Sequence, residues 1–517
     1  MLEALRRFAS AFGLLCALHV AACADSGTPS GDAGVDVDGQ INGRDGGGRD
    51  AHSGVDGSDN SGLGALITPL PANLIGVPDG GTEVLYVRGD GLLMRSKPDG
   101  TQPTELGIKP TFGYGPNPNL WVWTDVDADN ALGTLNLYRP GDARTSVIAA
   151  QAAVDLFGVD EDGRRALSLV HVMDTGSGAT STRTADFILV DDSGTQRLLR
   201  SGVAIGRWDR RTHRHVGPCT PLADFLNAPV AVYLGCPSLA DKTRHAYLID
   251  LTTGNTSTIA ENVSAFLRVG TDKSYALLAD AAGGFFGVGA DGRIVHLPEQ
   301  DRLDSLAFLD GKRFAYTTSN NELMIASWPS LMPVVAVPAG ASRIERASEA
   351  GDRLVFRQTT SMLGLRDLYV VDTSTATAHT PVALDAMADG YPGDDVFSED
   401  GQWVQWLEKA DANFVADIVT IRADGSGQSK LLGTSGYIVQ NTADPDRVMV
   451  MVGTRISETT HRLISSMATV SRSGSDRPTI LADDVDPLSF QIFPAKDRIF
   501  YRISEGPNAG LWVRELK

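Results

Sequence analysis

A single basic cluster interrupts an otherwise acidic chain. The 517 residues carry a formal net charge of −19 at pH 7. The residues of the cluster with binding chemistry are Arg207, Trp208, Arg210, Arg211, His213 and His215. Guanidinium groups bind carboxylates and phosphates through paired hydrogen bonds, so the cluster could receive an anionic group of a ligand. If the segment is extended, His213 and His215 share a face and could hold a metal ion. No third ligand is indicated, so a hydrated loop with charge compensation is the favoured interpretation.

A second candidate site is an alternation of carboxylates at Asp125, Asp127 and Asp129. Calcium-binding loops use this spacing for their first ligands, so a calcium site is one interpretation. Position six of such a loop would be Asn130 instead of glycine, and position twelve would be Asn136 instead of a bidentate glutamate. A solvated turn that follows a strand is therefore the favoured interpretation. The sequence predicts no other cofactor.

Two cysteines, Cys219 and Cys236, lie outside the N-terminal region of the chain. In an exported protein such a pair predicts a disulfide. In the chain-entropy model, closing about 17 residues would stabilise the fold by roughly 3 kcal/mol. Two free buried thiols are the alternative. A zinc site is disfavoured because no further cysteine is available and the spacing fits no zinc finger.

The elements that must position these residues repeat along most of the chain. Each unit is a polar turn followed by a strand-like alternation, and the sharpest copy is Phe397–Trp406, where Gly401 is free to take a positive φ. Ten units lie at residues 78–86, 117–123, 160–169, 229–233, 272–277, 309–316, 351–356, 397–406, 444–450 and 496–501. Between Glu83 and Arg498, nine intervals cover 415 residues, about 46 residues each.

A period of this size with four short strands per unit is the signature of a β-propeller. The sequence therefore predicts an all-β fold for residues 63–517, with a single propeller of about eight to ten four-stranded blades. The last unit ends one strand short, and residues 63–70 could supply an N-terminal strand that closes the ring. Ten units exceed the usual four to eight blades, so two units that are not blades, or two smaller rings, remain alternatives.

The repeat resembles that of TolB-type propellers, which are related in pattern to WD repeats. Their blades carry a Phe-Ser-Pro-Asp-Gly turn, and this chain has Phe397-Ser398-Glu399-Asp400-Gly401. They also carry a strand of the pattern seen here in 368–372, Leu-Tyr-Val-Val-Asp. The resemblance implies the blade structure and is silent about activity. TolB has an additional N-terminal α/β domain that this chain does not match, so its partners are not carried over.

The N-terminus predicts an export signal. Arg6 and Arg7 precede an apolar run at residues 8–20, which has the length of a signal-peptide core. The run ends in Val-Ala-Ala-Cys, which resembles the lipobox of bacterial lipoproteins. That resemblance implies removal of residues 1–22 and lipidation of Cys23, while an ordinary secretory signal is the alternative. Ala24 in the next position favours the outer membrane of a Gram-negative cell envelope over retention in the inner membrane.

Residues 24–62 have the composition of a disordered tether. They contain 11 Gly and 8 Asp among 39 residues and no aromatic residue. Such a segment has no apolar surface to offset the entropy lost on ordering. Its root-mean-square span would be roughly 34 Å, enough to lift a domain from a membrane surface. The predicted lipidated and tethered segment is therefore 23–62, followed by the propeller at 63–517.

Two classes of function fit these features. The first is a lipid-anchored cell-envelope protein whose propeller is a binding scaffold for other envelope proteins or for a polysaccharide or peptide ligand. The second is a propeller enzyme, a hydrolase or lyase acting on an extracytoplasmic sugar or peptide, because such sites are assembled from several blades and leave no linear motif. No catalytic residue is predicted. Nucleic acid is not expected as a partner, because a chain with a net charge of −19 repels a phosphate backbone.

Overall fold

The computed structural model divides the chain into two units, residues 1–62 and 63–517. The residues that it describes all belong to the second unit. They run from 63 to 516 with gaps at 70–71, 77–80, 109–111, 114–120, 128–131, 143–144, 154–155, 161–163, 176–181, 210–213, 217–218, 228, 239–242, 299–304, 360–365, 376–378, 389–395, 409–414, 488 and 494–496. All elements assigned within these residues are β-strands, β1 to β39. None of the described segments forms a helix long and apolar enough to cross a membrane.

The first half of the described chain forms antiparallel sheets whose strands follow one another in chain order. The first sheet contains β2 (Ala72–Gly76), β3 (Val84–Arg88), β4 (Leu92–Ser96) and β5 (Thr104–Ile108). The second contains β6 (Phe112–Gly113), β7 (Trp121–Asp127), β8 (Leu132–Tyr138) and β9 (Ser146–Ala153). The third contains β10 (Leu156–Val159), β11 (Arg165–Thr175), β12 (Thr182–Asp191), β13 (Gln196–Asp209) and β14 (Arg214–Val216). The fourth contains β15 (Leu222–Leu226), β16 (Val230–Gly235), β17 (His245–Asp250) and β18 (Thr256–Ala260).

Three further four-stranded sheets continue the pattern. The fifth sheet contains β19 (Val263–Val269), β20 (Tyr275–Asp280), β21 (Phe285–Gly289) and β22 (Ile294–His296). The sixth contains β23 (Ser305–Phe308), β24 (Arg313–Thr317), β25 (Leu323–Ser327) and β26 (Val334–Val337). The seventh contains β27 (Ala341–Ala347), β28 (Arg353–Thr359), β29 (Arg366–Asp372) and β30 (Val382–Ala388).

The remaining strands join into one ten-stranded sheet. Its members are β31 (Trp403–Glu408), β32 (Val415–Arg422), β33 (Ser429–Asn441), β34 (Arg447–Ile456), β35 (Leu463–Ser471), β36 (Thr479–Val485), β37 (Gln491–Ile492), β38 (Arg498–Ile503), β39 (Gly510–Glu515) and β1 (Ala65–Thr68). The long strand β33 explains the fusion: its first half pairs with β32 and its second half with β34. The large sheet thus contains three further repeat units.

The ten predicted turn-and-strand units all correspond to observed strands. Their strands are β3, β7, β11, β16, β20, β24, β28, β31, β34 and β38. Each pairs with a strand on either side except β31, which pairs with β32 and forms an isolated bridge to Phe397 on its other side. The turn of the sharpest copy is also confirmed. Gly401 has a φ of 66°, and the backbone N–H of Trp403 donates to Oγ of Ser398 at 2.9 Å.

The strand of this copy is buried on both faces. Its residues Trp403, Val404, Gln405 and Trp406 are all at most 3% exposed. Val404 and Trp406 pack against the seventh sheet. Oε1 of Gln405 faces the other way and accepts a hydrogen bond from the buried guanidinium of Arg472. Both faces of the strand are covered because a neighbouring unit packs on each of them.

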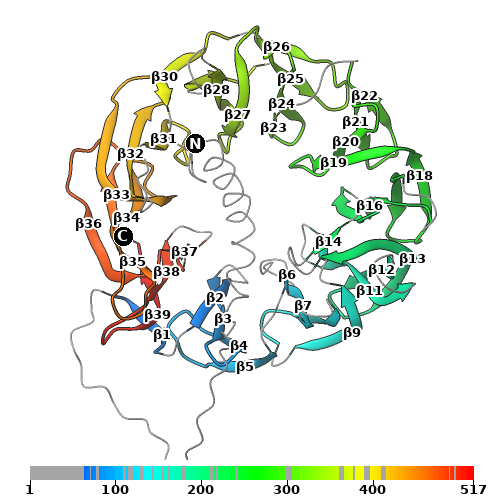
Figure 1. Cartoon of the computed structure of the whole chain (residues 1–517), viewed down its shortest axis with the longest axis horizontal. Helices are drawn as coiled ribbons and strands as arrows, with labels where there is room; N and C mark the ends of the chain where they lie inside the picture. The colour runs from blue at the N-terminus through cyan, green and yellow to red at the C-terminus, as the bar shows by residue number, and fades with distance from the viewer. Residues whose placement is uncertain are drawn as a thin grey trace, which may run out of the picture. The chain divides into compact units, whose positions relative to one another are not determined.

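Figure 1 shows the sheets following one another in chain order. Apolar clusters join each of the first four sheets to the next one. Further clusters join the fifth sheet to the sixth, the sixth to the seventh and the seventh to the ten-stranded sheet. Two more clusters lie between the repeat units of the ten-stranded sheet. A further cluster contains Val84 and Tyr86 of the first sheet together with Phe500 and Leu511 of the last unit. The two ends of the described domain are therefore packed on each other.

The predicted N-terminal strand is present and pairs with the last strand of the chain. β1 pairs antiparallel with β39, and Leu66 lies opposite Trp512. Just before this strand, the carbonyl of Leu63 accepts a hydrogen bond from the hydroxyl of Tyr501. Arg502 of β38 adds a second link, because its guanidinium donates to Oδ1 of Asn73 in the first sheet at 2.5 Å and pairs with Asp486.

Two adjacent residues of β1 provide a matched test of this closure. Ile67 is 6% exposed and packs in the cluster between the first sheet and the last unit, whereas Leu66 is 38% exposed. Ile67→Ala should lower the free energy of unfolding by about 3 kcal/mol through lost burial and the cavity left behind. Leu66→Ala should lower it by less than about 1 kcal/mol. Urea denaturation followed by tryptophan fluorescence measures both, and equal losses would contradict the packing role of β1.

Candidate functional site

The basic cluster lies where the third sheet exceeds the four-stranded pattern. β13 is 14 residues long and turns into the short β14, which adds a fifth strand. In this hairpin Trp208 lies opposite His215, and Arg207 lies opposite Val216. Arg210, Arg211 and His213 lie outside the described residues, and only the backbone pairing is described for Arg207, Trp208 and His215. Three of the six predicted residues, Arg207, Trp208 and His215, are thus brought to one hairpin, and the use of the cluster in binding stays a prediction.

The strands beside this hairpin are also long. β11 has 11 residues and β12 has 10, whereas β15 and β16 of the next sheet have 5 and 6. Two polar pairs connect β11 with β12: Nε of Arg183 donates to Oδ1 of Asp174 at 2.8 Å, and Nδ1 of His171 lies 3.1 Å from Oδ2 of Asp186. The third sheet therefore projects past its neighbour as a ribbon, and β14 extends the same end.

The predicted disulfide is present at the base of this projection. Cys219 and Cys236 are bonded, with their Cα atoms 5.2 Å apart. Both cysteines are buried and pack with Ala204 of β13. The bond ties the residues before β15 to the end of β16. Because it touches β13 next to the hairpin, it restrains the chain on both sides of the basic cluster.

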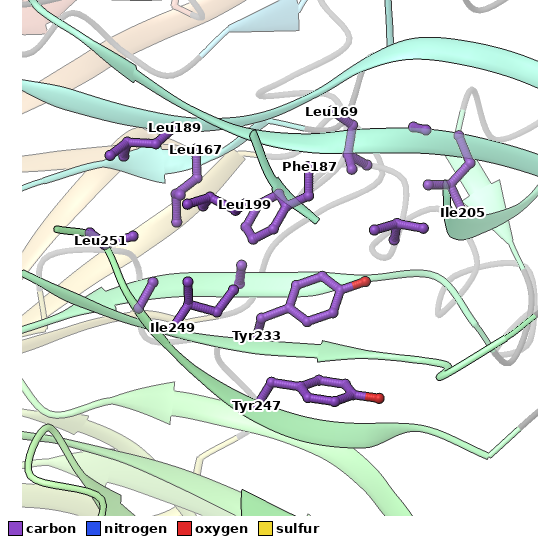
Figure 2. Packing of buried hydrophobic residues seen from close by; sticks show 14 of the residues in the cluster. Leu167, Leu169, Phe187, Leu189, Leu199, Ile205, Tyr233, Tyr247, Ile249 and Leu251 are labelled. Carbon is purple, nitrogen blue, oxygen red and sulfur yellow. The ribbon is translucent and has the colours of Figure 1, made fainter. Parts of the chain in front are cut away.

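Aromatic rings fill the interface between the third and fourth sheets just below this end (Figure 2). Phe187 of β12 stacks on Tyr233 of β16 at a centroid distance of 4.9 Å, and Tyr233 lies 5.8 Å from Tyr247 of β17. Figure 2 shows the hydroxyl groups of both tyrosines directed toward the same end of the interface. Tyr233 is fully buried, which raises the pKa of its hydroxyl.

The hydroxyl of Tyr233 has no hydrogen-bond partner among the described residues. It faces the backbone of Gly235, where an added Cβ would lie 2.2 Å from the hydroxyl oxygen. Tyr501 occupies the matching position, the fourth residue of the second strand in its unit, and donates to the carbonyl of Leu63. A buried hydroxyl without a partner costs about 1–3 kcal/mol, so Tyr233 is an exception that needs a physical reason.

Arg200 of β13 covers these rings. Its Cζ atom lies 4.3 Å from the ring centroid of Tyr247 and 5.9 Å from that of Tyr233. Cation–π contacts of this kind are worth about 0.5–2 kcal/mol. The hydrogen bonds of Arg200 to the carbonyl of Pro237 and to the hydroxyl of Tyr247 are both 3.5 Å long. The guanidinium is therefore held by ring contact more than by hydrogen bonds.

Two other ionisable groups of the fourth sheet have perturbed environments. Burial lowers the pKa of Arg244, whose Nε has no partner among the described residues. Burial also raises the pKa of Asp224 on β15, opposed by a hydrogen bond from the backbone N–H of Phe225 and by the charge of Lys273. Sequence reasoning missed Arg200, Tyr233, Arg244 and Asp224, because each owes its character to contacts between sheets.

The acidic candidate is placed differently from the expectation. Asp125 and Asp127 lie within β7, opposite Thr134 and Leu132 of β8, so the expected turn after a strand is wrong for these two residues. β7 continues because its partner β8 runs alongside it to that point. Asp129 lies outside the described residues. In the part of the chain that the structure describes, no group of three or more His, Cys, Asp or Glu side chains could hold a metal ion. Calcium binding stays a prediction.

Comparison with known proteins gives distant structural matches only. No protein-family model matches the chain, and no curated protein sequence matches it. Among solved structures, TolB from Acinetobacter baumannii is 15% identical with a TM-score of 0.26 and covers 61% of this chain and 79% of its own. A putative TolB from Agrobacterium tumefaciens is 12% identical with a TM-score of 0.27 over 53% of this chain and 98% of its own.

Dipeptidyl peptidase 4 from Porphyromonas gingivalis is a third match. It is 9% identical with a TM-score of 0.43 and covers 87% of this chain and 66% of its own. The matches thus include TolB proteins and a peptidase. Identities and TM-scores in this range do not identify a shared function.

Removing the disulfide should destabilise the domain without changing its fold. The bond closes a loop with a sequence separation of 17 residues. Replacing both residues, Cys219→Ala with Cys236→Ala, should lower the free energy of unfolding by about 3 kcal/mol in the chain-entropy model. Denaturation in urea with and without a reducing agent measures this. The reductant should shift the wild-type midpoint and leave that of the variant alone, and an unshifted wild type would contradict the prediction.

Tyr233 and Tyr501 should respond oppositely to loss of the hydroxyl. Tyr233→Phe removes an unpartnered buried group, so the free energy of unfolding should stay unchanged or rise by about 1 kcal/mol. Tyr501→Phe removes a donor and leaves the carbonyl of Leu63 without it, so stability should fall by about 1 kcal/mol. Thermal denaturation of both variants provides the comparison. A loss for Tyr233→Phe as large as that for Tyr501→Phe would show that Tyr233 has a partner in the isolated protein.

Proposed function

We propose that this chain is a cell-envelope lipoprotein whose β-sheet domain is a binding scaffold. In the proposal Cys23 carries the lipid, residues 24–62 form the tether, and the anchor lies in the outer membrane of a Gram-negative bacterium. Two acyl chains bind a membrane stably because each buried CH₂ contributes about 0.8 kcal/mol. The sequence pattern of residues 1–62 supports this part of the proposal.

The domain itself is proposed to be a single closed propeller of ten blades. Support comes from the ten repeat units, from β1 completing the last unit and from the cluster that packs the first sheet on the last. A closed arrangement leaves each apolar sheet face covered by a neighbour, which two separate smaller rings would not achieve with the same set of clusters.

The observation that carries the binding role is the projection of the third sheet. The third sheet has three strands of 10 to 14 residues and adds β14 as a fifth strand, and a disulfide restrains its base. Insertions on a rigid scaffold are where binding residues concentrate. The basic residues of the hairpin suit an anionic partner, such as an acidic segment of an envelope protein or an acidic polysaccharide. The enzymatic alternative has no observation in the described residues that favours it over binding.

Capture in cells tests this function. The full-length protein would be expressed in a Gram-negative host, crosslinked, purified from membranes and examined by mass spectrometry. Arg210→Ala with Arg211→Ala should reduce the recovery of captured partners at least tenfold. Arg455→Ala is the control, because Arg455 is an exposed arginine of the ten-stranded sheet, with 55% of its side chain accessible. Cys23→Ser should move the protein from the membrane to the soluble fraction.

Each part of this experiment has a result that would contradict the proposal. Equal capture by the hairpin variant and the control would remove the hairpin from the binding surface. Membrane recovery of Cys23→Ser equal to that of the wild type would contradict the lipid anchor. If the purified protein catalytically converts a ligand identified by the capture, and the hairpin variant does not, the enzymatic alternative would be favoured.

A further inference from the structure

Three donor groups meet at the end of the interface between the third and fourth sheets, and the described residues offer them few acceptors. The hydroxyl of Tyr233 has no partner, and the hydroxyl of Tyr247 points to the same end (Figure 2). Arg200 lies over both rings and makes only the two hydrogen bonds of 3.5 Å. A set of donors that lacks acceptors is suited to a ligand that supplies oxygen atoms and negative charge.

Arg200 differs in this respect from two other arginines that are buried at least in part, Arg357 and Arg95. Arg357 lies 2.7 Å from Glu345, and Arg95 lies 2.9 Å from Glu83. Within the described residues Arg200 has no carboxylate within ion-pair distance, although the chain has 64 acidic residues and a net charge of −19. A partly buried guanidinium without an acidic partner leaves charge that a ligand can neutralise.

We propose that this end of the interface binds a carboxylate group. Arg200 would be the ionic partner, and the hydroxyl groups of Tyr247 and Tyr233 would donate hydrogen bonds to the carboxylate. A planar carboxylate matches the fork of a guanidinium and presents both oxygens to neighbouring donors. This inference rests on the proposed function and gives it a ligand chemistry: a carboxylate at the end of, or along, the anionic partner.

Access of a carboxylate to the hydroxyl of Tyr233 depends on the side chain of Arg200. Tyr233 is fully buried, whereas Arg200 is partly exposed. Because both hydrogen bonds of Arg200 are long, turning its side chain toward solvent costs mainly its contacts with the two rings, and the side chain can return paired with the ligand. The hydroxyl of Tyr233 lies against the backbone of Gly235, in the space that a side chain there would occupy. The disulfide between Cys219 and Cys236 holds the residue after Gly235 in place.

Acetate is the probe, and acetamide is its uncharged counterpart of similar size. The full-length protein in detergent would be titrated with each up to 100 mM at constant ionic strength, with chloride as balancing anion, while the melting temperature is recorded. Acetate should raise the melting temperature saturably, and acetamide should not. Inorganic phosphate at the same concentration tests whether the site prefers a carboxylate. A shift with phosphate equal to that with acetate would overturn the assignment to carboxylates.

Three variants locate the site. Arg200→Gln should abolish the acetate shift, and Tyr233→Phe should weaken acetate binding about tenfold. Arg197→Gln is the matched control: Arg197 is on the same strand but donates to the carbonyls of Leu251 and Thr252, so acetate binding should persist. Far-ultraviolet circular dichroism checks folding, and Tyr233→Phe keeps the ring if Arg200→Gln does not fold. Unchanged acetate binding in Arg200→Gln or in Tyr233→Phe, or equal losses in Arg197→Gln, would overturn the proposal.

The acetate titration and the capture experiment test the two proposals independently of each other. If acetate binds through Arg200 while the hairpin variant captures partners like the wild type, the scaffold function is wrong and the carboxylate site stands. If acetate has no effect while capture depends on Arg210 and Arg211, the scaffold function stands and the carboxylate site is overturned.

Discussion

The structure depends on one constraint. Each sheet has two apolar faces, and only neighbouring sheets can shield these faces from water. β31 makes the point, since Trp403 to Trp406 are all buried although successive side chains point to opposite faces. Every unit therefore needs a neighbour on both sides. The first and last units of such a chain would each leave one apolar face exposed unless they cover each other, and β1 and the cluster of Val84 with Leu511 provide this cover.

The same constraint determines where the domain tolerates additional structure. Inside the interfaces, a change in length would disturb the packing of two sheets. Strands can be longer beyond the end of an interface without exposing the residues buried inside it. The third sheet has such long strands in β11, β12 and β13. The disulfide and the ring stack of Phe187, Tyr233 and Tyr247 lie directly below this extension. A projecting ribbon on a rigid base is the arrangement that a binding surface requires.

Much of the fold follows from local sequence. A turn such as Ser398 to Gly401 followed by alternating residues specifies a hairpin without help from the rest of the chain, so ten strands could be predicted. Strand ends were less predictable, because β7 continues through Asp127 only where β8 runs beside it. The disulfide followed from cysteine number and export. The environment of Arg200 and Tyr233 depends on residues about 35 to 50 positions apart in neighbouring sheets, which no local pattern encodes.

The central claim is that partners bind at the projecting end of the third sheet. Site-specific photocrosslinking tests it most directly, with a photoreactive phenylalanine derivative in place of Trp208 in β13. The same derivative in place of Ile294 in β22 or Val334 in β26, both 39% exposed, provides controls on other sheets. The account predicts crosslinked partners from position 208 and none from the other two. Equal crosslinking from all three positions, or crosslinking from 294 and 334 alone, would contradict it.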